Sequence, residues 1–256
     1  MESPYTIPAL AKTFTIIEYI SQYPEGVTFM EIVNELNVPK SSVYKILHTL
    51  EKEAWIEKTG TRYKLGYMMI HYGMLTLSRR NISKVARPFL ENLMNEVGET
   101  THLAVLSGTK SMFLDICERR EHIKLSFPIG SLFPLYRTSH GKIFLAYCIK
   151  KDLKEFIKEE PLIKKTDYTI VTLDNLYKEI ETIKKNGYSL DNRECFDDIR
   201  CCAAPIFGNR GQCIAAVGIT STIDRFPTSR LKEISAKVKK TALSISKEMG
   251  YIPKEL

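Results

Sequence analysis

The segment from residue 29 to residue 65 constrains the fold most, because it has the layout of a winged helix-turn-helix. Asn37-Val38-Pro39 interrupts a first apolar helical face, and Pro39 stands where a second helix can begin without losing a needed amide donor. The apolar residues of this second helix follow i, i+3, i+4, i+7 spacing and are expected to face inward. They are Val43, Ile46, Leu47 and Leu50.

The opposite face of the second helix predicts an interface with double-stranded DNA. Its side chains can donate hydrogen bonds to phosphates and to base edges in a major groove, and basic residues of a following hairpin would extend the contact. The candidate DNA-binding residues are Lys40, Ser41, Ser42, Tyr44, Lys45, His48, Arg62 and Lys64. A winged helix that binds protein is the alternative interpretation of this pattern.

Total charge does not decide between these alternatives. The chain carries a net charge of +7, yet residues 1–65 contain seven Lys or Arg and eight Asp or Glu, a balance of −1. DNA binding is therefore supported by the local placement of the basic residues on the second helix and the hairpin.

Two further apolar sets are expected to complete the small N-terminal core. A first helix that packs behind the other two is marked by Leu10, Phe14, Ile17 and Ile20. Residues 55–65 alternate around Thr59-Gly60-Thr61 as a β-hairpin does. The hairpin residues expected to cover the core are Trp55, Ile56, Tyr63 and Leu65.

Residues 66–80, GYMMIHYGMLTLSRR, are apolar almost all the way round if they form a helix. Such a helix is too short to span a bilayer, which takes roughly 20 apolar residues, and it needs a partner surface. The same helix of another subunit is the expected partner, which predicts a homo-oligomer and a two-fold operator. A helix buried within one chain is the alternative.

The second half of the chain mixes strand and helix patterns. Two strands are expected within residues 101–120, a third apolar run covers 122–128, and a β-hairpin is expected within 200–222. Helices are expected at 143–158, at 173–187 and in the final segment 228–250. This order predicts an α+β domain with a mainly antiparallel sheet.

With these residues in view, the whole chain resembles transcriptional regulators of the IclR family. The N-terminal match lies in LNVPKSSVYKILHTLEKEAWIEK, with Ala54 where a glycine is usual and Lys45 where arginine is commoner. The late strands keep the family's spacing at Gly187, Tyr188, Asp191, Glu194, Cys201 and residues 203–207. The loop element G-x-x-x-P-L and T-x-x-G-K is carried by Gly130, Pro134, Leu135, Thr138, Gly141 and Lys142.

The resemblance implies a regulator that binds a DNA operator as a dimer or tetramer and senses a small molecule. It implies a winged helix-turn-helix over residues 1–65, a linker helix for dimerisation over 66–84, and a GAF-like or profilin-like effector-binding domain over 85–256. The expected effector pocket lies between the turn before the Gly141-Lys142 helix and the two late strands. Its candidate residues are Ser139, His140, Asp191, Cys201, Gly218 and Thr220.

Physical chemistry supports an acidic effector. Ser139 and His140 lie where free backbone amides at a helix N-terminus would point outward, which favours a small carboxylate. In relatives that sense small oxo-acids, the positions matching 218 and 220 tend to carry hydroxyls. Only Thr220 does so here, so a roomier pocket is expected, with an aromatic or sugar-derived acid as plausible as glyoxylate or pyruvate.

A thiol-dependent enzyme that uses Cys201, His140 and Asp191 is the chemical alternative. Their order and spacing match no nucleophile motif, and Cys201 reads as part of a buried strand, where a thiol is usually inert. No Cys or His pair shows zinc-ligand spacing. We therefore expect no enzyme activity, no cofactor and no metal, and we interpret His102 as a structural or surface residue.

Cysteine usage bounds the compartment. The six cysteines follow no paired framework, and the N-terminus has no signal-peptide pattern. Reduced thiols in the cytoplasm, with no membrane partner, are the expected state.

Overall fold

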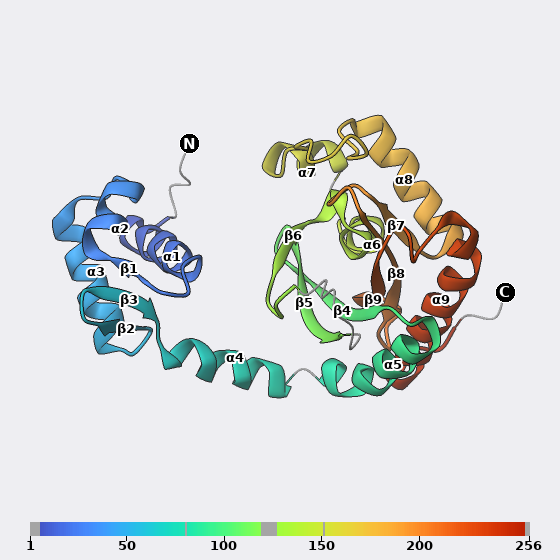
Figure 1. Cartoon of the computed structure of the whole chain (residues 1–256), viewed down its shortest axis with the longest axis horizontal. Helices are drawn as coiled ribbons and strands as arrows, with labels where there is room; N and C mark the ends of the chain where they lie inside the picture. The colour runs from blue at the N-terminus through green and yellow to red at the C-terminus, as the bar shows by residue number, and fades with distance from the viewer. Residues whose placement is uncertain (1–5, 80, 119–126, 151, 254–256) are drawn as a thin grey trace. The chain divides into compact units, whose positions relative to one another are not determined.

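The computed structural model describes residues 6–79, 81–118, 127–150 and 152–253 (Figure 1). Contacts between residues divide the chain into two compact units, Met1–Arg80 and Asn81–Leu256. The assignment of residues 66–84 to a separate linker and dimerisation region stays a prediction. Within the described residues, no helix is both long and apolar enough to cross a membrane.

The first unit is a helix-turn-helix with a small antiparallel sheet in the order β1-β3-β2. Its elements are α1 (Pro8–Ser21), β1 (Val27–Thr28), α2 (Phe29–Leu36), α3 (Lys40–Lys52), β2 (Ile56–Thr59), β3 (Arg62–Leu65) and α4 (Tyr67–Arg79). A capping box starts α2, because the Thr28 hydroxyl accepts from the Glu31 amide while the Glu31 carboxylate accepts from the Thr28 amide. Asn37 ends α2 in the left-handed conformation, with φ of 49°. The predicted break between the two helices is confirmed.

The core of the first unit confirms the inward face predicted for α3 and corrects two other expectations. Its buried members are Ile16, Ile20, Val27, Ile32, Val38, Val43, Leu47, Leu50, Ile56 and Tyr63. Leu10 and Phe14 were expected to pack inward but are 51% and 66% exposed. The buried side of α1 is set by Ile16 and Ile20, and Phe14 lies about 200° from Ile16 around the helix. Leu65, expected to cover the core, is also exposed, at 38%.

The second unit contains a six-stranded antiparallel sheet in the order β6-β5-β4-β9-β8-β7. Its strands are β4 (Thr100–Ser107), β5 (Lys110–Cys117), β6 (Leu132–Pro134), β7 (Ser189–Asn192), β8 (Ile199–Phe207) and β9 (Cys213–Thr222). Its helices are α5 (Asn81–Val97), η1 (Leu135–Arg137), α6 (Ser139–Tyr147), α7 (Leu153–Glu159), α8 (Leu173–Asn186), η2 (Thr228–Arg230) and α9 (Leu231–Glu248). The expected α+β class with an antiparallel sheet is confirmed.

Helices cover both faces of this sheet (Figure 1). On one side α6 packs against β8, β9 and β7 and is itself covered by α8, whereas α5 and α9 pack together on the other side. The core around α6 is built from Leu135, Tyr136, Ile143, Phe144, Phe156, Leu176 and their neighbours. This arrangement holds the N-terminus of α6 against the face of the sheet.

One helix boundary was predicted wrongly. The sequence pattern predicted a single helix over residues 143–158, but α6 ends at Tyr147 and α7 begins at Leu153. The Asp152 carboxylate accepts a hydrogen bond from the Lys154 amide, so Asp152 caps the start of a new helix. Residues 122–126 of the third apolar run, 122–128, lie outside the described residues.

Candidate functional site

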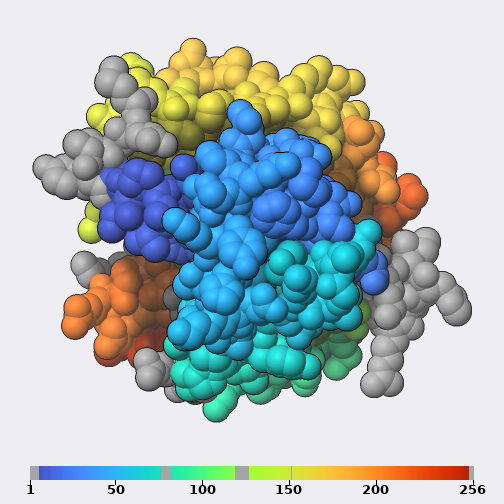
Figure 2. All heavy atoms as spheres, turned by 90° about the vertical axis from the view of Figure 1, so that its left-hand side faces the viewer, coloured from blue at the N-terminus to red at the C-terminus, as the bar shows by residue number. Residues whose placement is uncertain are grey.

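The outer face of α3 carries most of the candidate DNA-binding residues. Lys40, Ser41, Tyr44, Lys45 and His48 are exposed, whereas Ser42 is half-buried. The rings of Tyr44 and His48 lie parallel, with centroids 6.4 Å apart. In Figure 2 the residues of α2 and α3 (blue) and those of the β2–β3 hairpin (cyan) form adjoining areas of one face of the first unit.

The two hairpin cations among the candidate DNA-binding residues, Arg62 and Lys64, already have partners within the unit. Arg62 donates from Nη1 to the Gly26 carbonyl over 2.7 Å and lies 3.8 Å from the Glu31 carboxylate. The Nζ of Lys64 lies 3.6 Å from the Glu25 carboxylate. Both would have to share these partners in order to contact a phosphate, so α3 is the stronger part of the candidate face.

In the second unit a pocket brings together five of the six predicted effector residues. It is lined by Phe113, Phe127, Phe133, Thr138, Ser139, His140, Asp191, Cys195, Phe196, Ile199, Cys201 and Thr220. Gly218 is the predicted residue that does not line it.

The start of α6 is fixed by a threonine cap and a close backbone approach. The Thr138 hydroxyl accepts a hydrogen bond from the Gly141 amide over 3.1 Å. A Cβ at Gly141 would lie 2.4 Å from the Leu135 carbonyl oxygen, so only glycine lets η1 pass this close to the helix. Ser139 and His140 therefore occupy the first turn, where amides have no acceptor inside the helix.

The late strands contribute a row of side chains. Asp191 of β7 pairs with Cys201 of β8, and Cys201 pairs with Thr220 of β9, whose hydroxyl lies 3.3 Å from the thiol sulfur. One Asp191 oxygen accepts from the Glu194 amide over 2.8 Å and from the Cys195 amide over 3.3 Å. Burial, reinforced by the nearby Glu194 carboxylate, raises the pKa of Asp191 to about 7.

A pair of buried histidines extends the site beyond the sequence prediction. His102, interpreted as a structural or surface residue, is buried, and its ring lies 5.4 Å from that of His140. Burial lowers the pKa of His102 to about 4, and burial together with His102 lowers that of His140 well below its usual value. Both imidazoles are therefore neutral at pH 7.

The expectation of a roomier pocket is wrong. Gly218 pairs with His102 across β9 and β4, and an ideal Cβ at residue 218 would lie 2.6 Å from Cε1 of His102. The histidine ring occupies the space that a side chain at position 218 would take.

The aromatic wall of the pocket was also missed. Phe113 comes from β5, Phe133 from β6, Phe127 from the segment before β6, and Phe196 from the segment between β7 and β8. These segments are far apart in sequence, and no local periodicity relates them. Only the fold brings the four rings together.

Lys142, named by the resemblance, anchors the site from outside the pocket. Its ammonium group is buried and lies 2.5 Å from the Glu194 carboxylate and 2.8 Å from that of Glu179. Burial alone would lower the pKa of Lys142, but the two carboxylates raise it, so the lysine remains charged. This ion pair ties α6 to the turn whose amides hold Asp191.

The pocket does not favour thiol chemistry. Burial and the neighbouring Asp191 raise the pKa of Cys201 well above its usual value, which disfavours the thiolate that a nucleophile requires. Among the described residues there is no group of three or more His, Cys, Asp or Glu that could hold a metal ion.

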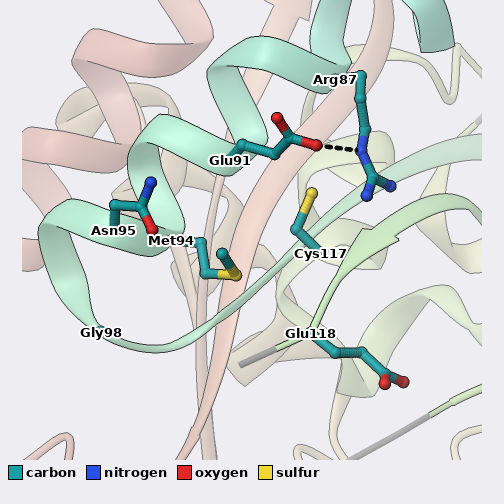
Figure 3. A pocket seen from close by; sticks show the side chains of 7 residues that line it. All are labelled: Arg87, Glu91, Met94, Asn95, Gly98, Cys117 and Glu118. Carbon is teal, nitrogen blue, oxygen red and sulfur yellow. Dashed lines mark hydrogen bonds and ion pairs between the residues drawn. The ribbon is translucent and has the colours of Figure 1, made fainter. Parts of the chain in front are cut away.

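A larger hollow of about 650 Å³ lies between α5 and the end of β5 (Figure 3). Its basic residue, Arg87, donates from Nε to Glu91 and from Nη1 to Asp115, each over 2.8 Å. Because two carboxylates already compensate this guanidinium, Arg87 offers little positive charge to an anionic ligand in the hollow.

Comparison with known proteins covers both units. Residues 9–60 match the family described as "IclR helix-turn-helix domain", and residues 74–247 match that described as "Bacterial transcriptional regulator IclR C-terminal". The chain is 31% identical over 251 residues to the HTH-type transcriptional regulator BhcR of Paracoccus denitrificans, covering 97% of this chain and 89% of that protein. It is 28% identical over 243 residues to the regulator KipR of Bacillus subtilis, covering 94% and 97%.

Solved structures agree. The IclR crystal structure from Thermotoga maritima is similar with a TM-score of 0.72 and 34% identity, covering 96% of this chain and all of that one. A regulator from Alicyclobacillus acidocaldarius has a TM-score of 0.81 at 20% identity, covering 96% and 100%, which shows a shared fold.

Proposed function

Because the chain belongs to the IclR family of bacterial transcriptional regulators, we propose that it binds a two-fold operator as a homo-oligomer and senses a small carboxylic acid. Its family consists of DNA-binding regulators rather than enzymes. The observation that carries the proposal is the exposed polar face of α3 on a helix whose other face is buried. Such a protein acts on chromosomal DNA, in the cytoplasm.

The apolar surface of α4 supports assembly with a second copy. Tyr67, Ile70, Met74 and Leu75 are exposed large hydrophobic residues within a single helix. Exposed apolar residues gathered on one short helix are typical of a surface that is covered in an assembly. Two copies joined through α4 would present two α3 helices to the half-sites of a palindrome.

The α6 pocket supports effector binding. Its first-turn amides and the neutral His140 can donate hydrogen bonds to a carboxylate. The raised pKa of Asp191, about 7, reduces the repulsion between this side chain and a bound carboxylate. A ligand that binds two arrangements of the oligomer unequally shifts its DNA affinity, typically by about 1–3 kcal/mol.

DNA binding is tested by a mobility-shift survey of genomic fragments, followed by a salt titration on a shifted fragment. If the DNA-binding units of two copies each neutralise about four phosphates, the logarithm of the binding constant should fall with the logarithm of the salt concentration at a slope of about −7. Lys45→Ala should weaken binding or relax sequence choice. Lys154→Ala, which removes an exposed positive charge from the second unit, is the control and should leave binding unchanged. Failure of well-folded protein to shift any fragment, or a slope near −1, contradicts docking of α3.

Effector sensing is tested separately with Asp191→Ala. We expect this variant to bind the operator like the unaltered protein and to lose the response to the ligand. Equal loss of both properties contradicts the proposed division of roles between the two units.

A further inference from the structure

The wall of the effector pocket has a polar part and an aromatic part. The polar part consists of the first turn of α6, Asp191 and Thr220, and the aromatic part is a cluster of four phenylalanine rings. The two parts meet at His140, whose ring centroid lies 4.8 Å from that of Phe113 and 6.0 Å from that of Phe133. The Phe113–Phe133 and Phe127–Phe133 centroids are each 5.3 Å apart at steep interplanar angles, and Phe127 stacks on Phe196 at 5.6 Å. Aromatic rings attract one another in these geometries.

The described part of the pocket wall offers little positive charge to a small anion. Among the described residues no Lys or Arg lines the pocket, and Lys142 is paired with Glu194 and Glu179. Arg137 interacts with Cys195 but does not itself line the space. A two- or three-carbon oxo-acid would lose its hydration without an apolar group that could pack against the phenylalanine rings, so its burial is weakly compensated.

His140 supplies a hydrogen-bonding group that lacks a partner. It is 4% exposed, and among the described residues neither of its ring nitrogens has a hydrogen-bond partner. The hydroxyl of Ser139 is likewise buried without one. Buried polar groups are normally satisfied, so these groups indicate where the polar end of a ligand binds.

The pocket is nearly closed around its rings. Its cavity volume is about 20 Å³, enough for one or two water molecules at about 10–15 Å³ each. Phe196, at 37%, is an exposed member of the wall, and Phe127 is half-buried. A ligand therefore enters by replacing contacts between these two rings, and a planar ring does so with the smallest loss of stacking.

We propose that the effector is a single-ring aromatic carboxylic acid whose ring packs among Phe113, Phe133 and the Phe127–Phe196 pair. Its carboxylate lies at the first turn of α6, where it accepts from the imidazole N–H of His140. The inference rests on the proposed effector-sensing function and narrows the class of ligand. Among the candidate effectors, it favours acids with an aromatic ring over glyoxylate and pyruvate.

The probes are benzoate, 4-hydroxybenzoate and phenylacetate, with cyclohexanecarboxylate and pyruvate as comparators. Calorimetric titration of the full chain should give at least one aromatic acid about tenfold tighter binding than cyclohexanecarboxylate, which has the same charge and similar size but no π face. Pyruvate should bind more weakly still. The inference is overturned if no aromatic acid binds below about 10 mM, if the saturated ring binds equally well, or if pyruvate binds tighter.

Two variants and one matched control locate the bound acid. Phe196→Leu keeps an apolar side chain but removes the ring, so aromatic acids should bind about tenfold more weakly. Phe207→Leu is the matched control, because Phe207 contacts Tyr147 and Tyr251 outside this pocket, and its affinity for aromatic acids should be unchanged. His140→Phe keeps a buried ring without the N–H and should abolish binding. Aromatic acids that bind all three variants equally lie elsewhere, and the inference fails.

The result separates this inference from the proposed function. If a non-aromatic acid binds the pocket and changes operator affinity, effector sensing stands and the aromatic assignment falls. If aromatic acids bind as expected but no genomic fragment is shifted, the ligand class stands and the proposed operator binding falls.

Discussion

The ring of His102 fills the space beside Gly218, where an ideal Cβ would lie only 2.6 Å from Cε1 of the imidazole. The two residues are partners across β4 and β9. A histidine at 102 therefore requires glycine at 218. Residue 218, predicted to contact the effector, instead packs against the neutral imidazole of His102. The composition of the pocket is set by this pairing rather than by residue 218 alone.

The first prediction concerns this pairing. Gly218→Ala should lower the free energy of unfolding by about 1–3 kcal/mol, because the new methyl group overpacks the sheet face. Removing the ring should not fully rescue it, since the same Cβ lies 2.6 Å from the Cys202 carbonyl oxygen. Urea unfolding of Gly218→Ala, His102→Ala and the double variant measures this. A change below about 0.5 kcal/mol in the first variant refutes the contact.

The second prediction concerns the pH dependence of stability. Asp191 has a folded-state pKa of about 7, above its usual value of 3.8, so its contribution is fully present below about pH 4 and is lost as pH rises through 7. Asp191→Asn keeps an oxygen acceptor for the Glu194 and Cys195 amides but does not titrate. The stability of the variant relative to the unaltered protein should rise between about pH 4 and 7, by at most about 1.4 kcal/mol per pH unit.

Urea unfolding of both proteins at several pH values measures this difference in the free energy of unfolding. The titration of the buried histidines cancels in the difference, because both proteins contain them. Parallel stability curves across this range would mean that Asp191 is ionised throughout.

Local patterns predicted the parts of the fold that depend on neighbouring residues. The break at Asn37-Val38-Pro39 and the inward residues of α3 followed from turn chemistry and helical spacing. The apolar pattern placed the start of α6 at residue 143, whereas this helix begins at Ser139, which confirms the expectation that Ser139 and His140 lie at a helix N-terminus. The break between α6 and α7 was missed, since apolar periodicity outweighed the capping signal of Asp152.

Long-range packing decided what the sequence could not predict. Apolar identity did not reveal which side of α1 is buried, and so Phe14 was assigned to the core. The four phenylalanines of the pocket come from separate segments, and the role of His102 depends on its cross-strand partner Gly218. Five of the six predicted pocket residues do meet. Ser139 and His140 lie at the start of α6, and the other three lie on the adjacent strands β7, β8 and β9, where alternation of side chains along a strand puts them on the same face.

The third prediction concerns Ala54, where a glycine is usual. Ala54 has φ of 57°, a left-handed conformation that a Cβ makes unfavourable. Ala54→Gly should therefore stabilise the protein by about 0.5–1 kcal/mol, the relief of strain exceeding the entropic cost of glycine. The midpoint of the thermal unfolding transition of the first unit measures this change in stability. Gly73→Ala on α4, with no atom within 4 Å of its would-be Cβ, tests the opposite exchange at a helical position. A lower midpoint for Ala54→Gly contradicts the prediction.

The fourth prediction concerns the buried ion pair between Lys142 and Glu194. Lys142→Met removes the ammonium but leaves the buried Glu194 carboxylate uncompensated, so it should destabilise the protein by about 3–5 kcal/mol. Lys164→Met is the control, because its 2.7 Å ion pair with Asp167 is exposed and should be worth at most about 1 kcal/mol. Adding Glu194→Gln to Lys142→Met should recover part of the loss, since no unpaired charge then remains buried at that position. Chemical unfolding of the four proteins measures these differences. Two outcomes would show that Lys142 does not compensate the charge of Glu194. One is an equal loss of stability in the two lysine variants, and the other is a double variant that is no more stable than Lys142→Met.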